Sequence, residues 1–423
     1  MPFKTLGLSD PLVRGILATG YTAPTEIQSQ VIPTAIEGKD IIGCAQTGTG
    51  KTAAFVLPIL NRLSHEPAAK GRVVRAVILT PTRELALQIH QCIVDYGRFL
   101  NLRTLTVYGG VNISGQLSQL SRGVDIIVAT PGRLIDHINR RTVDLRHTEV
   151  LVLDEADRML DMGFINDVRK IISYVPQKRQ TMLFSATIPK EIHSLASSVM
   201  QHPKTIQVGR QHNPIETITQ HLFSVTKENK MQLLLHMLQN GSMYSVLIFS
   251  RTKHGADRIS RKLQQADIKS MSLHSDRTQN QRQRALEGFK SGKFQVLVAT
   301  DIAARGIDVE GISHVINHDV PSFAEDYIHR IGRTGRAAAT GDAITFVARD
   351  EEKYVRQIEK FIGKKLKFEK CEGFVPSNPE PNQEHEHRPE RPQRSDRTRN
   401  EESRERSHRG KKKSFPYWRK KKR

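Results

Sequence analysis

Short apolar runs alternate with amphipathic stretches along most of the chain. In the first half, these runs occupy residues 40–44, 75–80, 124–130, 150–153 and 181–185. A polar or Gly/Pro-containing turn follows each run, and in most cases a stretch with helical periodicity comes next. Continuous apolar strands separated by helices predict a parallel sheet that is covered on both faces. We expect the functional loops at the carboxyl ends of these strands.

The same alternation begins again after residue 216 and predicts a second sheet. The strands expected there are 219–225, 246–249, 270–273, 295–299, 315–317 and 343–347. This second α/β domain has a similar size, but its sequence contains no phosphate-binding loop. We therefore expect it to complete a site that the first domain begins.

The pattern divides the chain into two domains, a linker and a tail. Residues 1–37 are expected to form amphipathic helices, broken by Pro11, Pro24 and Pro33. The polar, aperiodic stretch between the two alternating sets is expected to be the linker. The expected boundaries are 1–208 for the first domain, 209–216 for the linker, 217–370 for the second domain and 371–423 for a disordered basic tail.

Charge indicates a polyanion as the natural partner. The 423 residues carry a net charge of +21 and have a pI near 10.0, which favours nucleic acid binding. Residues 380–423 contain 16 Lys/Arg and 8 Asp/Glu and no apolar residue before Phe415. Such a segment cannot bury enough surface to fold alone. Its cationic runs around Tyr417 and Trp418 suit phosphate attraction and base stacking.

The cysteines and the N-terminus indicate the compartment. Cys44, Cys92 and Cys371 are widely spaced and form no metal or disulfide pattern, which fits a reducing environment. The first residues lack the layout of a signal peptide, and no apolar run is long enough to cross a bilayer. We expect a soluble cytoplasmic protein with no membrane partner.

One stretch carries a phosphate-binding pattern. Residues 45–52, Ala-Gln-Thr-Gly-Thr-Gly-Lys-Thr, lie between an expected strand and an expected helix. Backbone N–H groups in such a loop point at the anion, Lys51 pairs with the β- and γ-phosphates, and the Thr52 hydroxyl reaches Mg²⁺. The general pattern begins with glycine, where this chain has Ala45.

A second stretch supplies acids opposite this loop. The expected strand 150–153 runs directly into Asp154-Glu155-Ala156-Asp157. An apolar strand that ends in acids is what a site handling Mg²⁺ and water needs. Together, the two stretches indicate hydrolysis of a nucleoside triphosphate.

These motifs, with others in order along the chain, resemble those of the DEAD-box RNA helicases of superfamily 2. The resemblance covers about residues 1–368, and residues 158–164 and the short basic tail look most like the bacterial RhlE-type subgroup. It implies two tandem RecA-like parallel-sheet domains and a disordered basic tail. It also implies ATP as the nucleotide and Mg²⁺ as the cofactor.

The resemblance implies which residues bind the nucleotide. Phe3 and the segment from Gly20 to Gln28 are similar to the family's Q motif, in which the Gln28 amide would recognise adenine and Phe3 would stack on it. Gly306 and Asp308 would meet the nucleotide from the second domain. The residues expected to bind it are Phe3, Tyr21, Thr25, Gln28, Ala45, Gln46, Thr47, Gly48, Thr49, Gly50, Lys51, Thr52, Gly306 and Asp308.

The resemblance also implies the catalytic roles. Thr52 and Asp154 would hold Mg²⁺, largely through water, beside Lys51. Glu155 would be the general base, or the group that orients the attacking water. In residues 329–336, Arg333 and Arg336 resemble arginine fingers, because a planar and permanently charged group suits a phosphoryl transition state. The residues expected to link the nucleotide site to domain closure are Asp157, Ser185, Thr187 and His329.

RNA is expected to lie across both domains. Glycines would let the strand approach the backbone closely, while Arg and Thr would bind phosphates and 2′-hydroxyls. Such contacts read the RNA backbone and give little sequence preference. The expected RNA-binding residues are Pro81, Thr82, Arg83, Gly109, Gly110, Thr130, Pro131, Gly132, Arg133, Ser250, Arg251, Gln279, Arg282, Thr300 and Asp301.

We therefore expect an ATP-dependent RNA helicase whose two domains close on ATP and RNA together, and which locally unwinds duplexes or remodels RNA–protein complexes. Ribosomal precursors or the RNA-degradation machinery are candidate partners, but the sequence does not identify the RNA, and ribosomal precursor, messenger and structured regulatory RNAs all stay open. A DNA helicase or translocase is the first alternative, and comparing stimulation of hydrolysis by RNA and DNA separates the two. A non-catalytic RNA clamp or annealing chaperone is the second. Intact Lys51, Glu155, Arg333 and Arg336 favour turnover over a clamp.

Overall fold

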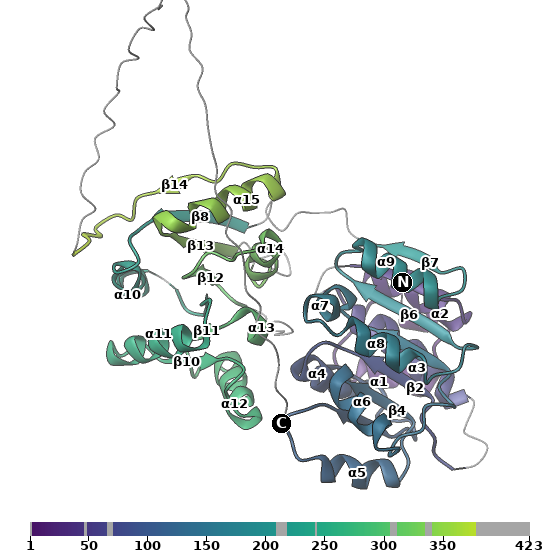
Figure 1. Ribbon diagram of the computed structural model, residues 1–423. Helices are drawn as coiled ribbons and strands as arrows, with labels where there is room; N and C mark the ends of the chain where they lie inside the picture. Colours follow the sequence, from purple (N-terminus) through teal and green to yellow (C-terminus); the bar gives the residue numbers. More distant parts are fainter. Residues whose placement is uncertain are drawn as a thin grey trace, which may run out of the picture. The chain divides into compact units, whose positions relative to one another are not determined.

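Two parallel seven-stranded sheets, each packed with helices, make up the described part of the chain (Figure 1). This computed structural model describes residues 2–45, 49–65, 71–208, 218–241, 243–304, 311–334 and 341–377. These residues belong to one compact unit, Met1–Asn378. The expected linker at 209–216 lies outside the described residues.

The first sheet has the strand order β3-β4-β2-β5-β6-β1-β7. Its strands are β1 (Ile41–Cys44), β2 (Ala76–Leu79), β3 (Thr104–Val107), β4 (Ile126–Ala129), β5 (Val150–Leu153), β6 (Gln180–Ser185) and β7 (Lys204–Gln207). Its helices are η1 (Phe3–Leu6), α1 (Asp10–Leu17), α2 (Glu26–Ile36), α3 (Lys51–His65), α4 (Arg83–Tyr96), α5 (Ile113–Ser121), α6 (Pro131–Asn139), α7 (Ala156–Asp161), α8 (Ile165–Ile172) and α9 (Lys190–Val199).

Both faces of this sheet are buried, as the continuous apolar runs predict. In β5, Val150 and Val152 belong to the core that includes residues of α1 to α4. Leu151 and Leu153 belong to the opposite core, formed with α6 to α9. Alternate residues of a strand point to opposite faces, so a strand buried on both faces has no polar positions.

The second sheet has the strand order β10-β11-β9-β12-β13-β8-β14. Its strands are β8 (Ile218–Ser224), β9 (Val246–Phe249), β10 (Ser270–Leu273), β11 (Val296–Ala299), β12 (His314–Asn317), β13 (Gly341–Val347) and β14 (Phe368–Glu369). Its helices are α10 (Lys230–Asn240), α11 (Lys253–Gln265), α12 (Gln279–Lys290), α13 (Asp301–Ala304), α14 (Ala324–Ile331), η3 (Arg349–Glu351) and α15 (Glu352–Ile362).

Two of the three prolines expected to break the N-terminal helices do not do so. Pro33 lies inside α2, where the N–H of Glu37 still donates to the Pro33 carbonyl at 3.1 Å. A proline near the end of a helix removes one hydrogen bond and leaves the next turn intact. Pro11 stands in the first turn of α1, where a missing N–H costs nothing.

The packed chain extends past the expected start of the tail at residue 371. Phe374 packs on the core that includes α10, and its ring lies 5.8 Å from that of His236. Ser377 donates to Gln232 through both its N–H and its hydroxyl. Residues 371–377 therefore belong with the second sheet, because apolar side chains precede the polar tail. The rest of the tail, from residue 378, lies outside the described residues.

Candidate functional site

The carboxyl edge of the first sheet divides into two neighbouring halves. Strands β5, β6 and β1 are adjacent in the sheet, and so are β3, β4 and β2. Loops that follow adjacent parallel strands lie side by side. The predicted phosphate loop follows β1, the predicted catalytic acids follow β5 and the coupling residue Thr187 follows β6, while the RNA-binding residues predicted in this domain follow β2, β3 and β4. One sheet edge therefore brings both sets together.

The loop after β1 contains a buried lysine. Lys51 is the first residue of α3, and its Nζ donates to the backbone O of Ala45 at 2.7 Å. The ammonium group thus lies within the loop, where phosphate oxygens can take the place of the carbonyl. Thr52 follows it on α3, and Thr49 precedes Gly50. Gln46, Thr47 and Gly48 lie outside the described residues.

Gln28 connects the N-terminal segment to this loop. Its Oε1 accepts from the backbone N–H of Thr25 at 3.0 Å, and its Nε2 donates to the backbone O of Gly50 at 3.1 Å. Gly50 has a φ of +91°, and a Cβ there would overlap the Gln28 amide, so the position requires glycine. Each end of the amide can form a second hydrogen bond, which leaves a donor and an acceptor for a base.

The two aromatic residues predicted near Gln28 differ in exposure. Phe3 is 3% exposed and packs in the first core beside Leu6. Tyr21 is 53% exposed, and its ring packs edge-on against Tyr96 with centroids 6.4 Å apart. Phe3 therefore contributes to the core, and its stacking on adenine stays a prediction.

The acids after β5 are buried. Burial raises the pKa of Asp154 well above its usual range, while the charge of Lys51 acts in the opposite direction. One Asp154 oxygen, Oδ1, accepts the Glu155 N–H at 3.1 Å. A buried carboxylate of this kind fits a bound cation, which would supply the charge that keeps it ionised. Glu155 is paired with Arg158, whose Nη1 donates to Glu155 Oε2 at 2.7 Å.

Thr52 and Asp154 together fit Mg²⁺ held by few protein ligands. In the described ranges, no group of three or more His, Cys, Asp or Glu side chains could hold a metal. Mg²⁺ usually keeps several waters and binds one or two carboxylates together with substrate phosphates. The donor set after β1 and β5 matches that mode of binding.

Asp157 connects the strand ends of β5 and β6. Its Oδ2 accepts the N–H of Ala186 at 3.1 Å, and both the N–H and the hydroxyl of Thr187, at 2.9 and 3.1 Å. The Asp157 N–H donates to the hydroxyl of Ser185 at 3.1 Å. The structure therefore brings together the three coupling residues predicted in this domain.

The second domain contributes His329 and Arg333 from the end of α14. Burial, followed by the positive charge of Arg158, lowers the pKa of His329 to about 4, so its imidazole is neutral at pH 7. Its Nδ1 is buried and has no hydrogen-bond partner among the described residues. Arg333 is buried, and its Nε donates to the backbone O of His329 at 3.3 Å. Gly306, Asp308 and Arg336 lie outside the described residues.

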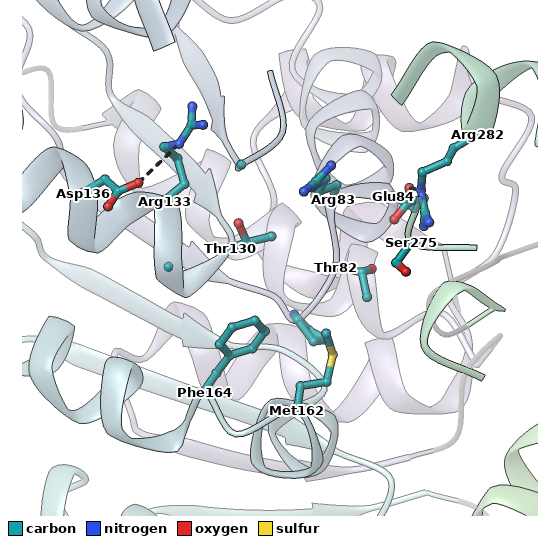
Figure 2. Close-up of a pocket in the computed structure, with 13 residues that line it drawn as sticks. Thr82, Arg83, Glu84, Thr130, Arg133, Asp136, Met162, Phe164, Ser275 and Arg282 are labelled. Atoms are coloured by element: carbon teal, nitrogen blue, oxygen red, sulfur yellow. Dashed lines mark hydrogen bonds and ion pairs between the residues drawn. The ribbon is translucent and has the colours of Figure 1, made fainter. Parts of the chain in front are cut away.

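Eight of the predicted RNA-binding residues line one cavity of about 490 Å³ (Figure 2). The N-termini of α4, α6 and α8 meet there, and helix N-termini favour anions. The lining residues are Pro81, Thr82, Arg83, Glu84, Gly109, Thr130, Gly132, Arg133, Asp136, Met162, Phe164, Ser275 and Arg282. Pro131, next to them, is the first residue of α6.

The cavity gathers three arginines. Burial lowers the pKa of Arg83, and the nearby charges of Arg282 and Arg133 lower it further, despite Glu84. Like charges at close range disfavour each other unless an anion lies between them. Gly110 has a φ of +78°, and a Cβ there would overlap the guanidinium of Arg83. This glycine therefore leaves room for Arg83 at the cavity wall.

Two of these arginines already have protein partners. Arg133 donates to Gln116 Oε1 at 3.3 Å and to the Val111 carbonyl at 3.2 Å. Arg282 donates to Glu84 Oε1 at 2.7 Å, and Figure 2 shows the two side chains facing each other. These bonds fix the direction of each guanidinium and leave other N–H groups for a ligand.

The other RNA-binding residues predicted in the second domain directly follow strands of its sheet or, for Gln279, begin α12. After β9, the hydroxyl of Ser250 donates to Asp319 Oδ2 at 3.2 Å, and Arg251 pairs with Glu351 at 2.7 Å. Gln279 begins α12, and Thr300 follows β11. Asp301 was predicted to contact RNA, but both of its oxygens accept from Arg330, at 2.6 and 2.7 Å.

Sequence reasoning missed several side chains around these sites. Met162 and Phe164 line the RNA cavity but belong to no predicted set. Arg158 pairs with the candidate base, and Arg330 joins Asp301 to Asn317. In the sequence, only the position of Arg158 next to the acidic motif signalled its role.

Comparisons with known proteins agree with this geometry. The family model described as DEAD/DEAH box helicase matches residues 25–195, and the helicase conserved C-terminal domain matches residues 229–338. The ATP-dependent RNA helicase CshA of Listeria monocytogenes is 44% identical over 364 residues, which cover 86% of this chain and 69% of that protein. The CshA of Limosilactobacillus reuteri is 43% identical over 360 residues, covering 85% and 72%.

Solved structures show the same architecture. S. cerevisiae Dbp5 bound to RNA and ADP BeF3 has a TM-score of 0.75 at 29% identity, covering 86% of this chain and 94% of that chain. Mss116p bound to ssRNA and AMP-PNP has a TM-score of 0.78 at 29% identity, covering 88% and 79%. Both sheets therefore form RecA-like domains in tandem. The chain belongs to the DEAD-box family of ATP-dependent RNA helicases.

Proposed function

We propose that the protein hydrolyses ATP when RNA is bound and uses the cycle to separate short RNA duplexes or to remodel RNA–protein complexes. The observation that carries this proposal is the shared carboxyl edge of the first sheet. There, the phosphate loop and buried acids follow β1 and β5, and the arginine-lined cavity follows β2 to β4. Nucleotide and RNA would thus occupy neighbouring loops of one rigid scaffold.

In the proposed reaction, water attacks the γ-phosphorus of ATP and gives a proton to Glu155, while the bond to the ADP oxygen breaks. Lys51 binds the β- and γ-phosphates, and Arg333 and Arg336 stabilise the charge that develops in the transition state. Mg²⁺, when bound, supplies further positive charge to the phosphates. Thr52 and Asp154 would hold it, the carboxylate largely through water.

The second domain makes hydrolysis conditional on closure. Arg333, Arg336, Gly306 and Asp308 belong to the second domain, whereas the phosphate loop belongs to the first. ATP and RNA would favour the same closed arrangement, in which Asp157, Ser185, Thr187 and His329 couple the two sites. A strand bent to fit the closed domains no longer fits a duplex, so a few base pairs separate.

RNA would be held mainly through its backbone. Three arginines and three helix N-termini at the cavity bind phosphates and carry no information about sequence. Little sequence preference is therefore expected. Asp301, whose carboxylate is held by Arg330, is better suited to positioning the loop after β11 than to contacting RNA.

A comparison of RNA and DNA tests the proposal. We expect RNA, and not DNA of the same sequence, to stimulate ATP hydrolysis, and ATP to drive separation of a short RNA duplex. Equal stimulation by DNA would favour a DNA translocase. If ATP tightens RNA binding but is not hydrolysed, the result would favour the non-catalytic RNA clamp.

Replacing Gly110 with alanine is expected to weaken RNA binding about tenfold, because the new Cβ displaces Arg83 and removes a charge-assisted contact. Gly115→Ala is the matched control, since a Cβ at Gly115, on α5, meets no atom within 4 Å. Fluorescence anisotropy with a single-stranded RNA measures both. Equal affinity of the two variants would show that Arg83 does not contact the RNA.

The domain boundaries, the helicase subgroup, the cellular location and the RNA partners are also proposals. We place the first domain at 1–208, the linker at 209–216 and the second domain from 217, and we move the start of the basic tail beyond residue 377. The RhlE-type subgroup finds no support in the relatives above, which carry the name CshA. A cytoplasmic location is proposed from the wide spacing of the three cysteines, and ribosomal precursors or the RNA-degradation machinery are proposed partners. No helix in the described ranges has the length and apolarity to cross a membrane.

A further inference from the structure

A buried ion pair lies directly beside the candidate general base. Arg158 Nη1 donates to Glu155 Oε2 at 2.7 Å, and the two side chains are only 5% and 6% exposed. Both residues stand at the start of α7, the short helix that follows β5 (Figure 1). The catalytic scheme above gives Arg158 no role.

The backbone fixes one end of this pair. Glu155 is a non-glycine residue in the left-handed region, with φ 53° and ψ 52°, and its carbonyl accepts the N–H of Met159 at 3.0 Å. A buried side chain on a constrained backbone has few directions to take. Arg158 then fixes the carboxylate end of the Glu155 side chain by binding one of its two oxygens.

The pair determines which Glu155 oxygen is available. Among the described residues, Oε2 accepts from Arg158, and no hydrogen bond to Oε1 is found. A charge-assisted bond from a planar guanidinium fixes the direction of its carboxylate partner. Oε1 is therefore the oxygen left to accept a proton from water.

Arg158 also contacts the coupling residues of the first domain. Its backbone N–H donates to Asp157 Oδ1 at 3.0 Å, and the other Asp157 oxygen, Oδ2, accepts from Thr187. Its charge is one of those that keep His329 neutral. The arginine thus lies between the base and the group that links hydrolysis to closure.

We propose that Arg158 is a positioning residue that fixes the Glu155 carboxylate and aims its free oxygen at the attacking water. The inference deepens the proposed function and rests on it. A salt bridge that only stabilises the fold would give a different result, because its loss would lower the melting temperature without a selective loss of turnover.

The test compares Arg158→Met, which keeps much of the side-chain volume, with Arg158→Lys, which keeps the charge and one donor. At saturating RNA, Arg158→Met is expected to lower kcat about tenfold to a hundredfold, part of the 10²–10⁴-fold typical of a positioned base. KM for ATP and the Kd for RNA should stay within about twofold, since the phosphate and RNA contacts remain. Arg158→Lys should recover part of kcat. Arg146→Met, at an exposed pair with Asp144, is the control and should match the parent.

A double-mutant cycle separates positioning from other roles. If Arg158 acts through Glu155, adding Arg158→Met to Glu155→Gln should change single-turnover hydrolysis less than twofold, because the group it positions is already lost. Multiplied losses in the double variant, or a parental kcat for Arg158→Met, would overturn the inference.

Thermal melting shows whether the variants fold. If Arg158→Met does not fold, Arg158→Lys decides: a lower kcat at unchanged KM supports the inference, and a parental kcat overturns it. Failure of RNA to stimulate the parent protein at all would instead refute the proposed function, so the two failures are distinguishable.

Discussion

Glu155→Gln will bind ATP and RNA like the parent protein but will fail to turn over repeatedly. The amide keeps the size of the side chain, yet it cannot accept a proton from the attacking water. A positioned general base contributes about 10²–10⁴-fold, so kcat should fall by that factor. Steady-state release of phosphate at saturating RNA measures the loss. Equilibrium titrations with an ATP analogue and RNA check that binding survives.

The control for this prediction is Glu191→Gln, which removes a carboxylate from the exposed start of α9. Its kcat should equal that of the parent. Hydrolysis by Glu155→Gln at the parental rate would show that Glu155 is not the base, and Arg158 would then have no base to position.

Replacing Arg333 and Arg336 together with alanine will remove most RNA-stimulated hydrolysis. Arginine fingers contribute about 10³–10⁵-fold to phosphoryl transfer, and the first domain has no substitute for them in the proposed scheme. A rapid-mixing assay of phosphate release after RNA addition measures the effect. Lysine in place of Arg333 should restore little of the RNA-stimulated hydrolysis that alanine removes, since an ammonium group cannot form the planar fork of a guanidinium.

Arg356→Ala is the matched control, because this arginine lies in an exposed pair on α15 of the same domain. Arg356→Ala should leave the burst of phosphate release that follows RNA addition unchanged. A burst of full size in the double variant would mean that the first domain completes the transition state alone.

In the first sheet, the sequence pattern predicts the interior strands well and the edge strands poorly, whereas β10, an edge strand of the second sheet, was predicted with its observed bounds. Strand β5 was predicted with its observed bounds because every residue in it is apolar. Strands β3 and β7 were not predicted. They lie at the two edges of the first sheet, where one face or the backbone edge meets water, so Thr104–Val107 alternates and Lys204–Gln207 is mostly exposed. A continuous apolar run is therefore a signature of the sheet centre.

The functional residues also fall into two groups: those that a short sequence motif predicts, and those whose partners only the folded structure reveals. The roles of Lys51, Asp154 and Asp157 were predicted from sequence, because each belongs to a short motif at a strand end, and these roles stay predictions. The pairing of Arg282 with Glu84 joins residues 198 positions apart, and no local spacing predicts it. Arg330 looked like its neighbours in an arginine-rich motif, and only packing shows that it holds Asp301.

The proposed mechanism requires that ATP and RNA stabilise one common closed arrangement of the two domains. The most direct test measures the Kd for RNA with and without a non-hydrolysable ATP analogue, and the Kd for the analogue with and without RNA. We expect each ligand to lower the Kd of the other by the same factor, about 5–150-fold for a typical coupling. Affinities that do not change when the other ligand is present would contradict it.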